Sequence, residues 1–188
     1  MELLSKNHKD KKEDTTKVLF DSGYLKVLDI NNYHVVQEHD MLICIPYLVE
    51  ENSILLRYED IPTYTYIRPE IDKFICVMSE TFEKNESPKD VLFRGLKEEF
   101  GIILNDKFQP EILTPIFANK ANTAQYHICI LPIMQYDYEQ IIPTTDGSEH
   151  EKKSSNIKVN INELNNYIIY DLITRYTIDI FKKHYSLF

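Results

Sequence analysis

The pattern of apolar and polar positions predicts several strands in the first part of this 188-residue chain. Val18–Ile30 is typical of two short strands around a turn at Asp21–Gly23. Met41–Val49 is an almost continuous apolar stretch, which predicts a strand buried on both faces of a sheet. After a turn at Glu50–Ser53, residues 54–60 alternate between apolar and polar positions, as the hairpin partner of that strand would.

The centre of the chain predicts an amphipathic helix with clear signals at both ends. Ser87 is a candidate N-cap, and Pro88 suits the first helical position because its missing N–H would have no partner there. Gly101 can adopt the left-handed conformation that ends a helix. The apolar face recurs every fourth residue, at Leu92, Leu96 and Phe100.

The remaining segments complete the pattern of an α/β fold. Residues 73–80 predict the strand that leads into the central helix, and Gln109–Ala118 and Ala124–Met134 predict two strands after it. Asn156–Leu164 is typical of a further strand and turn, and Asn165–Phe188 has the apolar spacing of a closing helix. We therefore predict an α/β sandwich around a mixed sheet.

Domain organisation and composition indicate a soluble globular protein. Residues 1–17 are charged and without periodicity, which predicts a flexible N-terminal tail before a single domain at 18–188. Hydrophobic residues make up 43% and charged residues 27% of the chain, and no apolar run is long enough to span a bilayer. The tail lacks the apolar core of a signal peptide, so we expect a cytoplasmic protein with no membrane partner.

Charge and cysteine content exclude further classes. The net charge of −9 disfavours general nucleic-acid binding through phosphates, because the protein would repel the nucleic-acid backbone. The three cysteines, Cys44, Cys76 and Cys129, lie in apolar, strand-like stretches without metal-ligand spacing. They predict buried reduced thiols rather than disulfides or a zinc site.

The candidate chemistry lies at the end of the central helix. Asp90, Arg94 and Glu98 follow one another four residues apart, which can be an ordinary surface ion-pair series. Glu98 and Glu99 are adjacent near the helix C-terminus, where the helix dipole disfavours negative charge. Two carboxylates in this position call for either solvent or a cation.

The same stretch, residues 80–102, resembles a degenerate Nudix box, whose pattern is GX5EX7REUXEEXGU with U a bulky apolar residue. The matching positions are Glu86, Arg94, Leu96, Glu98, Glu99, Gly101 and Ile102. Two positions depart from the pattern. Glu80 stands where the box begins with Gly, and Gly95 stands where the Glu of the Arg-Glu pair belongs.

The resemblance implies a Nudix-like α/β/α sandwich and a Mg²⁺- or Mn²⁺-dependent hydrolase. The substrate would be a nucleoside diphosphate linked to another moiety, such as an ADP-ribose-like compound or a nucleotide sugar. Glu98 and Glu99 would bind the metal, and Glu86 and Arg94 would support them by charge pairing. By analogy with the family, the protein would form a homodimer.

Two loops hold further candidates. In many relatives a late loop supplies an extra carboxylate, and Glu149 and Glu151 in Asp137–Ser155 are the candidates for this catalytic role. The alternative is an ordinary surface loop. Arg57, Tyr64 and Arg68 are candidates for substrate contacts, although Tyr64 and Arg68 can also belong to an ordinary proline-containing loop.

Gly95 supports an alternative function. Because this position has no side chain, the chain can instead be a catalytically impaired Nudix-fold protein that binds a nucleotide or a protein partner without hydrolysis.

Overall fold

The structure, a computed structural model, describes residues 16–61, 68, 70, 74–144 and 151–186. The chain divides into two compact units. One unit contains the described residues up to His39 together with Phe117–Gln125, and the other contains Asp40–Ile116 and Tyr126–Phe188. That the chain is a single domain stays a prediction, and most of the predicted tail lies outside the described residues.

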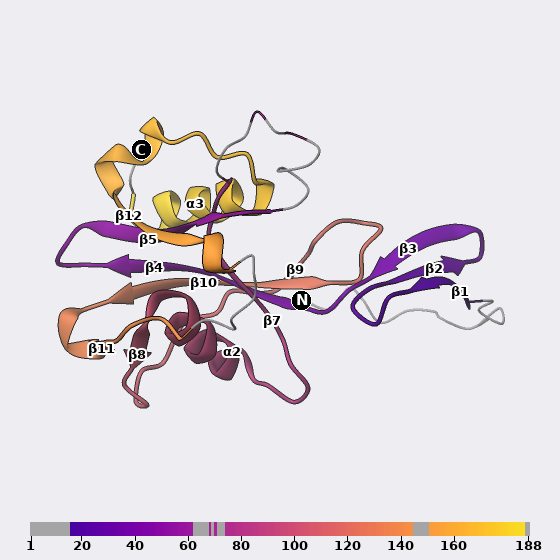
Figure 1. The fold of residues 1–188 in the computed structure, drawn as a ribbon, viewed down its shortest axis with the longest axis horizontal. Coiled ribbons are helices and arrows are strands. Elements are labelled where there is room, and N and C mark those ends of the chain that lie inside the picture. The colour runs from indigo at the N-terminus through magenta and orange to yellow at the C-terminus, as the bar shows by residue number, and fades with distance from the viewer. Residues whose placement is uncertain (1–15, 62–67, 69, 71–73, 145–150, 187–188) are drawn as a thin grey trace, which may run out of the picture. The chain divides into compact units, whose positions relative to one another are not determined.

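The first unit is built on a three-stranded antiparallel meander (Figure 1). Its strands are β1 (Thr16–Asp21), β2 (Lys26–Ile30) and β3 (Tyr33–Gln37). The turn between β1 and β2 contains Gly23 at φ +86°, a conformation that glycine adopts without steric cost. The predicted pair of strands is confirmed, whereas β3 was not predicted.

The second unit contains a seven-stranded mixed sheet in the order β12-β5-β4-β10-β9, with β6 beside β5 and β7 beside β4. The strands are β4 (Met41–Leu48), β5 (Ser53–Glu59), β6 (Phe74–Cys76), β7 (Met78–Thr81), β9 (Ile116–Phe117), β10 (Gln125–Ile133) and β12 (Ser155–Asn160). Strand β10 runs parallel to β4, while β5 and β7 run antiparallel to it. The predicted α/β fold with a mixed sheet is confirmed.

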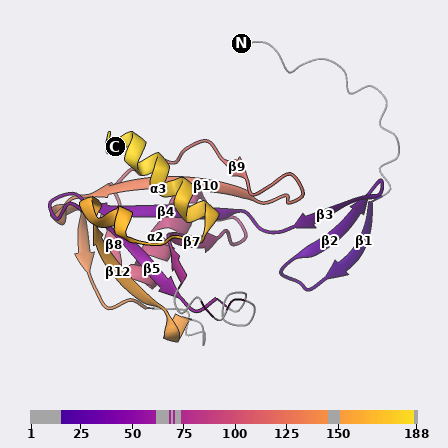
Figure 2. The ribbon, with the colours of Figure 1, turned by 90° about the horizontal axis from the view of Figure 1, so that it is seen from above.

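One helix packs on each face of this sheet (Figures 1 and 2). Because successive side chains of a strand point to opposite faces, Leu42 and Cys44 pack toward α2 (Pro88–Gly95), and Ile43 and Ile45 pack toward α3 (Leu172–His184). The layers are therefore helix, sheet and helix.

The three cysteines are free and buried, and Cys44 and Cys129 belong to the core on the α2 side of the sheet. Burial raises the pKa of the Cys44 and Cys76 thiols above the ordinary value, which keeps them protonated. The predicted buried, reduced thiols are confirmed.

The predicted strand at Gln109–Ala118 is wrong over most of its length, because only Ile116–Phe117 forms a strand (β9). Pro110 and Pro115 lack the N–H that a sheet ladder needs, so this segment crosses β10 with only an isolated bridge at Ile112.

The closing helix was predicted to begin at Asn165, which is too early in the sequence. A 3₁₀ helix at Ile161–Asn166 comes first, and α3 begins only at Leu172. Asp171 is the N-cap: its Oδ2 accepts from the Thr174 backbone N–H at 2.8 Å. Of the apolar residues just before it, Ile168 and Tyr170 are exposed, whereas Tyr167 and Ile169 pack against the core.

A small second sheet was also not predicted. It pairs β8 (Ile102–Leu104) with β11 (Tyr138–Gln140), which follows a 3₁₀ turn at Gln135–Asp137. Another 3₁₀ turn at Glu151–Lys153 precedes β12. Among the described residues, no helix combines the length and the apolar character needed to cross a bilayer.

Candidate functional site

The candidate site is built on α2, whose start agrees with the predicted cap. Ser87 Oγ accepts from the Asp90 N–H at 3.3 Å, and Asp90 Oδ2 accepts from the Ser87 N–H at 2.9 Å. This reciprocal pair is a capping box, which satisfies two N–H groups that the helix leaves free. The helix therefore begins at Pro88, as predicted.

The end of the helix departs from α geometry. After Gly95 the chain continues as a π-helical turn, Leu96–Phe100, which Gly101 ends at φ +66°. Such widened turns are rare and are frequent at functional sites. The turn carries both Glu98 and Glu99, so the sequence predicted the place of the carboxylate pair but not its local geometry.

Arg94 holds three carboxylates at once. Its Nε and Nη2 donate to the two oxygens of Glu86, each at 3.0 Å, and its Nη1 donates to Glu80 Oε2 at 2.7 Å. Glu98 Oε2 lies 3.5 Å from Nη1, and the Thr81 carbonyl accepts from Nη2 at 2.8 Å. Arg94 therefore pairs with several carboxylates rather than forming a single surface ion pair, and the predicted support of the metal ligands by Glu86 and Arg94 stays a prediction.

Electrostatics agree with this arrangement. The hydrogen bonds that Arg94 donates to Glu86 lower the pKa of Glu86, and the same hydrogen bonds raise the pKa of Arg94. Both groups are therefore charged at neutral pH. Arg94 thus fixes the loop between β7 and α2 to the helix while keeping Glu80 and Glu98 close to each other.

Glu99 is the buried member of the set. Its residue is only 8% exposed, and its Oε2 has no hydrogen-bond partner among the described residues. Arg57 Nε lies 3.3 Å from that oxygen, but its N–H is directed to Glu59 Oε1 at 3.1 Å. Burial raises the pKa of Glu99 well above its ordinary value, and the charge of Arg57 only partly opposes this.

Glu80 lies next to Glu99. It belongs to β7, opposite Leu42 of β4, and its side chain is 14% exposed. Its carboxyl group is close enough to that of Glu99 for each to affect the pKa of the other. Burial raises the pKa of Glu80, with Arg94 opposing the shift. Burial disfavours the charged form of both carboxyl groups, so a cation bound between them would be stabilised.

Arg57 is buried behind this pair. It lies on β5, 6% exposed, with Nη1 3.5 Å from the Glu99 carbonyl and 3.5 Å from Asn156 Oδ1. Asn156 on β12 donates to the same carbonyl at 2.6 Å. Both residues therefore hold the backbone of the π turn in place. A substrate contact by Arg57 stays a prediction.

The other predicted site residues lie apart from this cluster or outside the described residues. Glu98 is partly exposed at the edge of the cluster. Arg68 is exposed and pairs with Glu70 at 3.8 Å. Tyr64 and Glu149 lie outside the described residues, and of Glu151 the structure describes only the backbone, in a 3₁₀ turn.

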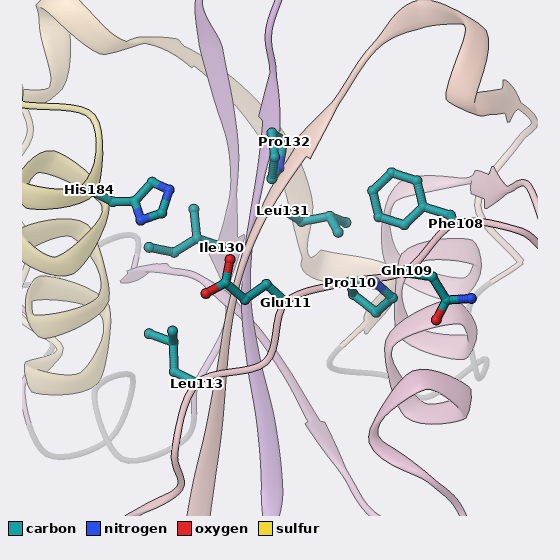
Figure 3. A pocket seen from close by; sticks show the side chains of 9 residues that line it. All are labelled: Phe108, Gln109, Pro110, Glu111, Leu113, Ile130, Leu131, Pro132 and His184. Carbon is teal, nitrogen blue, oxygen red and sulfur yellow. The ribbon is translucent and has the colours of Figure 1, made fainter.

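A pocket of about 330 Å³ opens beside the cluster. Arg94, Lys97 and Glu98 contribute its charged lining from the helix, with Asp106 opposite. A second pocket, of about 200 Å³, lies between α3 and β10, and Figure 3 shows that His184 and Glu111 are its charged or titratable lining residues. It contains none of the box carboxylates, so the first pocket is the one next to the candidate chemistry.

The donor set fits a hard cation that takes few protein ligands. No group of three His, Cys, Asp or Glu side chains in the described ranges could hold a metal ion as it stands. The contact between Glu80 and Glu99 and the unsatisfied Oε2 of Glu99 offer two carboxylates. Mg²⁺ is commonly held by one or two carboxylates, with waters and substrate phosphates as its other ligands.

Sequence reasoning missed Glu80, Glu59 and Asn156. Glu59 and Asn156 come from strands far along the chain, and no local pattern marks them. One sequence feature could have indicated Glu80. Relative to the box pattern, a Glu stands at position 80 in place of Gly, and a Gly stands at position 95 in place of Glu. Only the structure shows that these two positions touch.

Comparison with known proteins supports the fold alone. No family model matches the chain, and no curated protein sequence matches it. A solved structure described as the crystal structure of an ADP compounds hydrolase is similar, with a TM-score of 0.63 and 13% sequence identity. The match covers 95% of this chain and 97% of that one.

Proposed function

We propose that this protein is a divalent-metal-dependent hydrolase that cleaves the phosphoanhydride of a nucleoside diphosphate linked to another moiety. The observation that carries the proposal is the buried carboxylate of Glu99, which has an unsatisfied oxygen beside Glu80 at the end of the box helix. A fold similar to that of an ADP compounds hydrolase supports the substrate class. Mg²⁺ or Mn²⁺ is the proposed cofactor.

Each residue of the cluster has a separate task in this proposal. Glu99 and Glu98 are the metal ligands, and Arg94 fixes Glu98 while tying Glu86 to the helix. Asn156 holds the π turn through the Glu99 carbonyl, which keeps the Glu99 side chain directed into the cluster. A bound divalent cation would neutralise the diphosphate and lower the pKa of a water.

The surroundings indicate how the substrate would be held. Lys97 lines the pocket beside Glu98 and offers a positive charge to a phosphate. Glu149 and Glu151 remain the candidates for an additional carboxylate that activates the water. A homodimer also stays a prediction.

The test is a hydrolysis screen with Mg²⁺ and Mn²⁺ over ADP-ribose, nucleotide sugars, NADH, dinucleoside polyphosphates and nucleoside triphosphates. We expect turnover of at least one diphosphate-linked compound, abolished in Glu99→Gln and kept in Glu83→Gln. Glu83 is exposed, and it contacts Glu86 of the cluster through its backbone N–H, which donates to Glu86 Oε2 at 2.8 Å and is kept in the variant. The substitution therefore makes the same change of charge and keeps this contact. Turnover that is equal in Glu99→Gln and the wild type would refute the proposal.

One observation favours a second candidate function, nucleotide binding without hydrolysis. The guanidinium of Arg57 lies 3.3 Å from Glu99 Oε2 and offers that oxygen a positive charge without any metal. In this case the protein would bind ADP-ribose equally well with EDTA and with Mg²⁺, and no product would form. Isothermal titration under both conditions separates the two functions.

A further inference from the structure

Glu80 and Gly95, the two residues that depart from the box, lie against each other in space. A Cβ atom added at Gly95 would lie 2.4 Å from Glu80 Cγ and 3.2 Å from Glu80 Oε1. Carbon atoms cannot approach to 2.4 Å without bonding, so a side chain at position 95 and the present Glu80 side chain exclude each other. The Glu80 side chain fills the space that the missing carboxylate would need.

The Glu80 carboxylate also reaches the partners that such a carboxylate would need. Its Oε2 accepts from Arg94 Nη1 at 2.7 Å, and its carboxyl group is close enough to that of Glu99 for the two groups to affect each other electrostatically. Glu98 is close enough for its charge to act on Glu80. A carboxylate from β7 thus joins the two carboxylates of the π turn.

We propose that Glu80 is a metal-binding residue that supplies, from β7, the carboxylate that the helix lacks at Gly95. The inference deepens the proposed function and rests on it. Glu80 then joins the proposed ligands Glu98 and Glu99, and waters and phosphate oxygens complete the coordination of Mg²⁺. Glycine at position 95 is required by this arrangement, because any larger residue there would displace Glu80.

The competing explanation is that Glu80 only fills space and neutralises Arg94. Arg94 already has Glu86 as a two-oxygen partner, so neutralisation alone does not require Glu80. A purely structural role predicts a change in folding stability without a change in metal affinity. Metal binding without substrate therefore separates the two explanations.

The experiment measures Mn²⁺ affinity by electron paramagnetic resonance of free Mn²⁺, on full-length protein without substrate. Glu80→Gln keeps the shape of the side chain and removes its charge, and Glu83→Gln is the matched control. We expect affinity to fall about tenfold or more in Glu80→Gln and to stay unchanged in Glu83→Gln. Circular dichroism confirms that each variant is folded.

A double variant tests the exchange of the two positions. Glu80→Gly should lose Mn²⁺ affinity as Glu80→Gln does. Adding Gly95→Glu to Glu80→Gly returns a carboxylate to the same space, so affinity should recover to within a few-fold of the wild type. Gly95→Glu alone should not raise affinity, because its side chain meets Glu80.

The outcomes distinguish this inference from the proposed function. Loss of Mn²⁺ binding in Glu99→Gln with full binding in Glu80→Gln would overturn the role of Glu80 and leave the hydrolase proposal standing. A folded double variant that binds as weakly as Glu80→Gly would overturn the exchange. Absence of Mn²⁺ binding in the wild type would overturn both proposals.

Discussion

Replacing Gly95 by Ala should have opposite effects on stability with and without the Glu80 side chain. Within a helix, Ala is more favourable than Gly by about 1 kcal/mol. Here the new Cβ would lie 2.4 Å from Glu80 Cγ, so Glu80 must leave its place between Arg94 and Glu99. Forcing an extra carbon into a packed site costs about 1–3 kcal/mol.

Gly95→Ala in the wild type should therefore lower the free energy of unfolding by up to about 2 kcal/mol. In a Glu80→Ala background the clash is absent, and the same substitution should raise stability by about 1 kcal/mol. The coupling between the two positions, measured as a double-mutant cycle, should be about 1–3 kcal/mol.

Urea denaturation followed by circular dichroism measures the four proteins of the cycle, with EDTA present so that metal binding does not contribute. An effect of Gly95→Ala that has the same sign and size in both backgrounds would refute the reasoning. That result would mean that the Glu80 side chain does not occupy the space beside Gly95.

Three further predictions concern stability. Gly101→Ala should lower the free energy of unfolding by about 3 kcal/mol or more, since the new Cβ would meet the Ile141 carbonyl oxygen at 2.1 Å. Gly23→Ala, also at positive φ but with no atom within 4 Å, should lower it by only about 1–2 kcal/mol. Equal losses in urea denaturation would contradict this. Phe181→Ala should lower the free energy of unfolding by about 3–5 kcal/mol, because the side chain is fully buried between α3 and the sheet; a loss below about 1 kcal/mol would be inconsistent with that packing. Because the pKa of Glu99 is raised, the folded state keeps a proton that the unfolded chain releases above about pH 4.3. The free energy of unfolding in EDTA should therefore fall as pH rises from 5 to 7, by at most ~1.4 kcal/mol per pH unit. Glu99→Gln should flatten this dependence, and equal slopes in both proteins would exclude Glu99 as its source.

The box helix was predictable because its signals are local. The Ser87 cap, the apolar stripe and the Gly101 terminator each act within a few residues, and the structure confirms all of them. The strand Met41–Val49 was predictable for a similar reason, since a short, almost continuous apolar stretch is typical of a strand buried on both faces of a sheet.

The candidate site was only partly predictable because its contacts are distant in sequence. Arg57 was predicted only as a candidate for a substrate contact, yet it is buried against Glu99, 42 residues later in the chain. The contact between Glu80 and Gly95 depends on how β7 packs against α2, which no local pattern reports. Short strands such as β8 and β11 exist through pairing with each other rather than through their own periodicity.

The measurement that tests the central claim most directly is the anomalous scattering of Mn²⁺ in crystals of the wild-type protein grown with Mn²⁺ and ADP-ribose. The account predicts an anomalous peak within direct coordination distance of both the Glu80 and Glu99 carboxylates, with diphosphate oxygens as further ligands. An anomalous peak that neither carboxylate contacts would contradict it. So would a structure in which the nucleotide is bound, no anomalous peak appears and Arg57 stays beside Glu99.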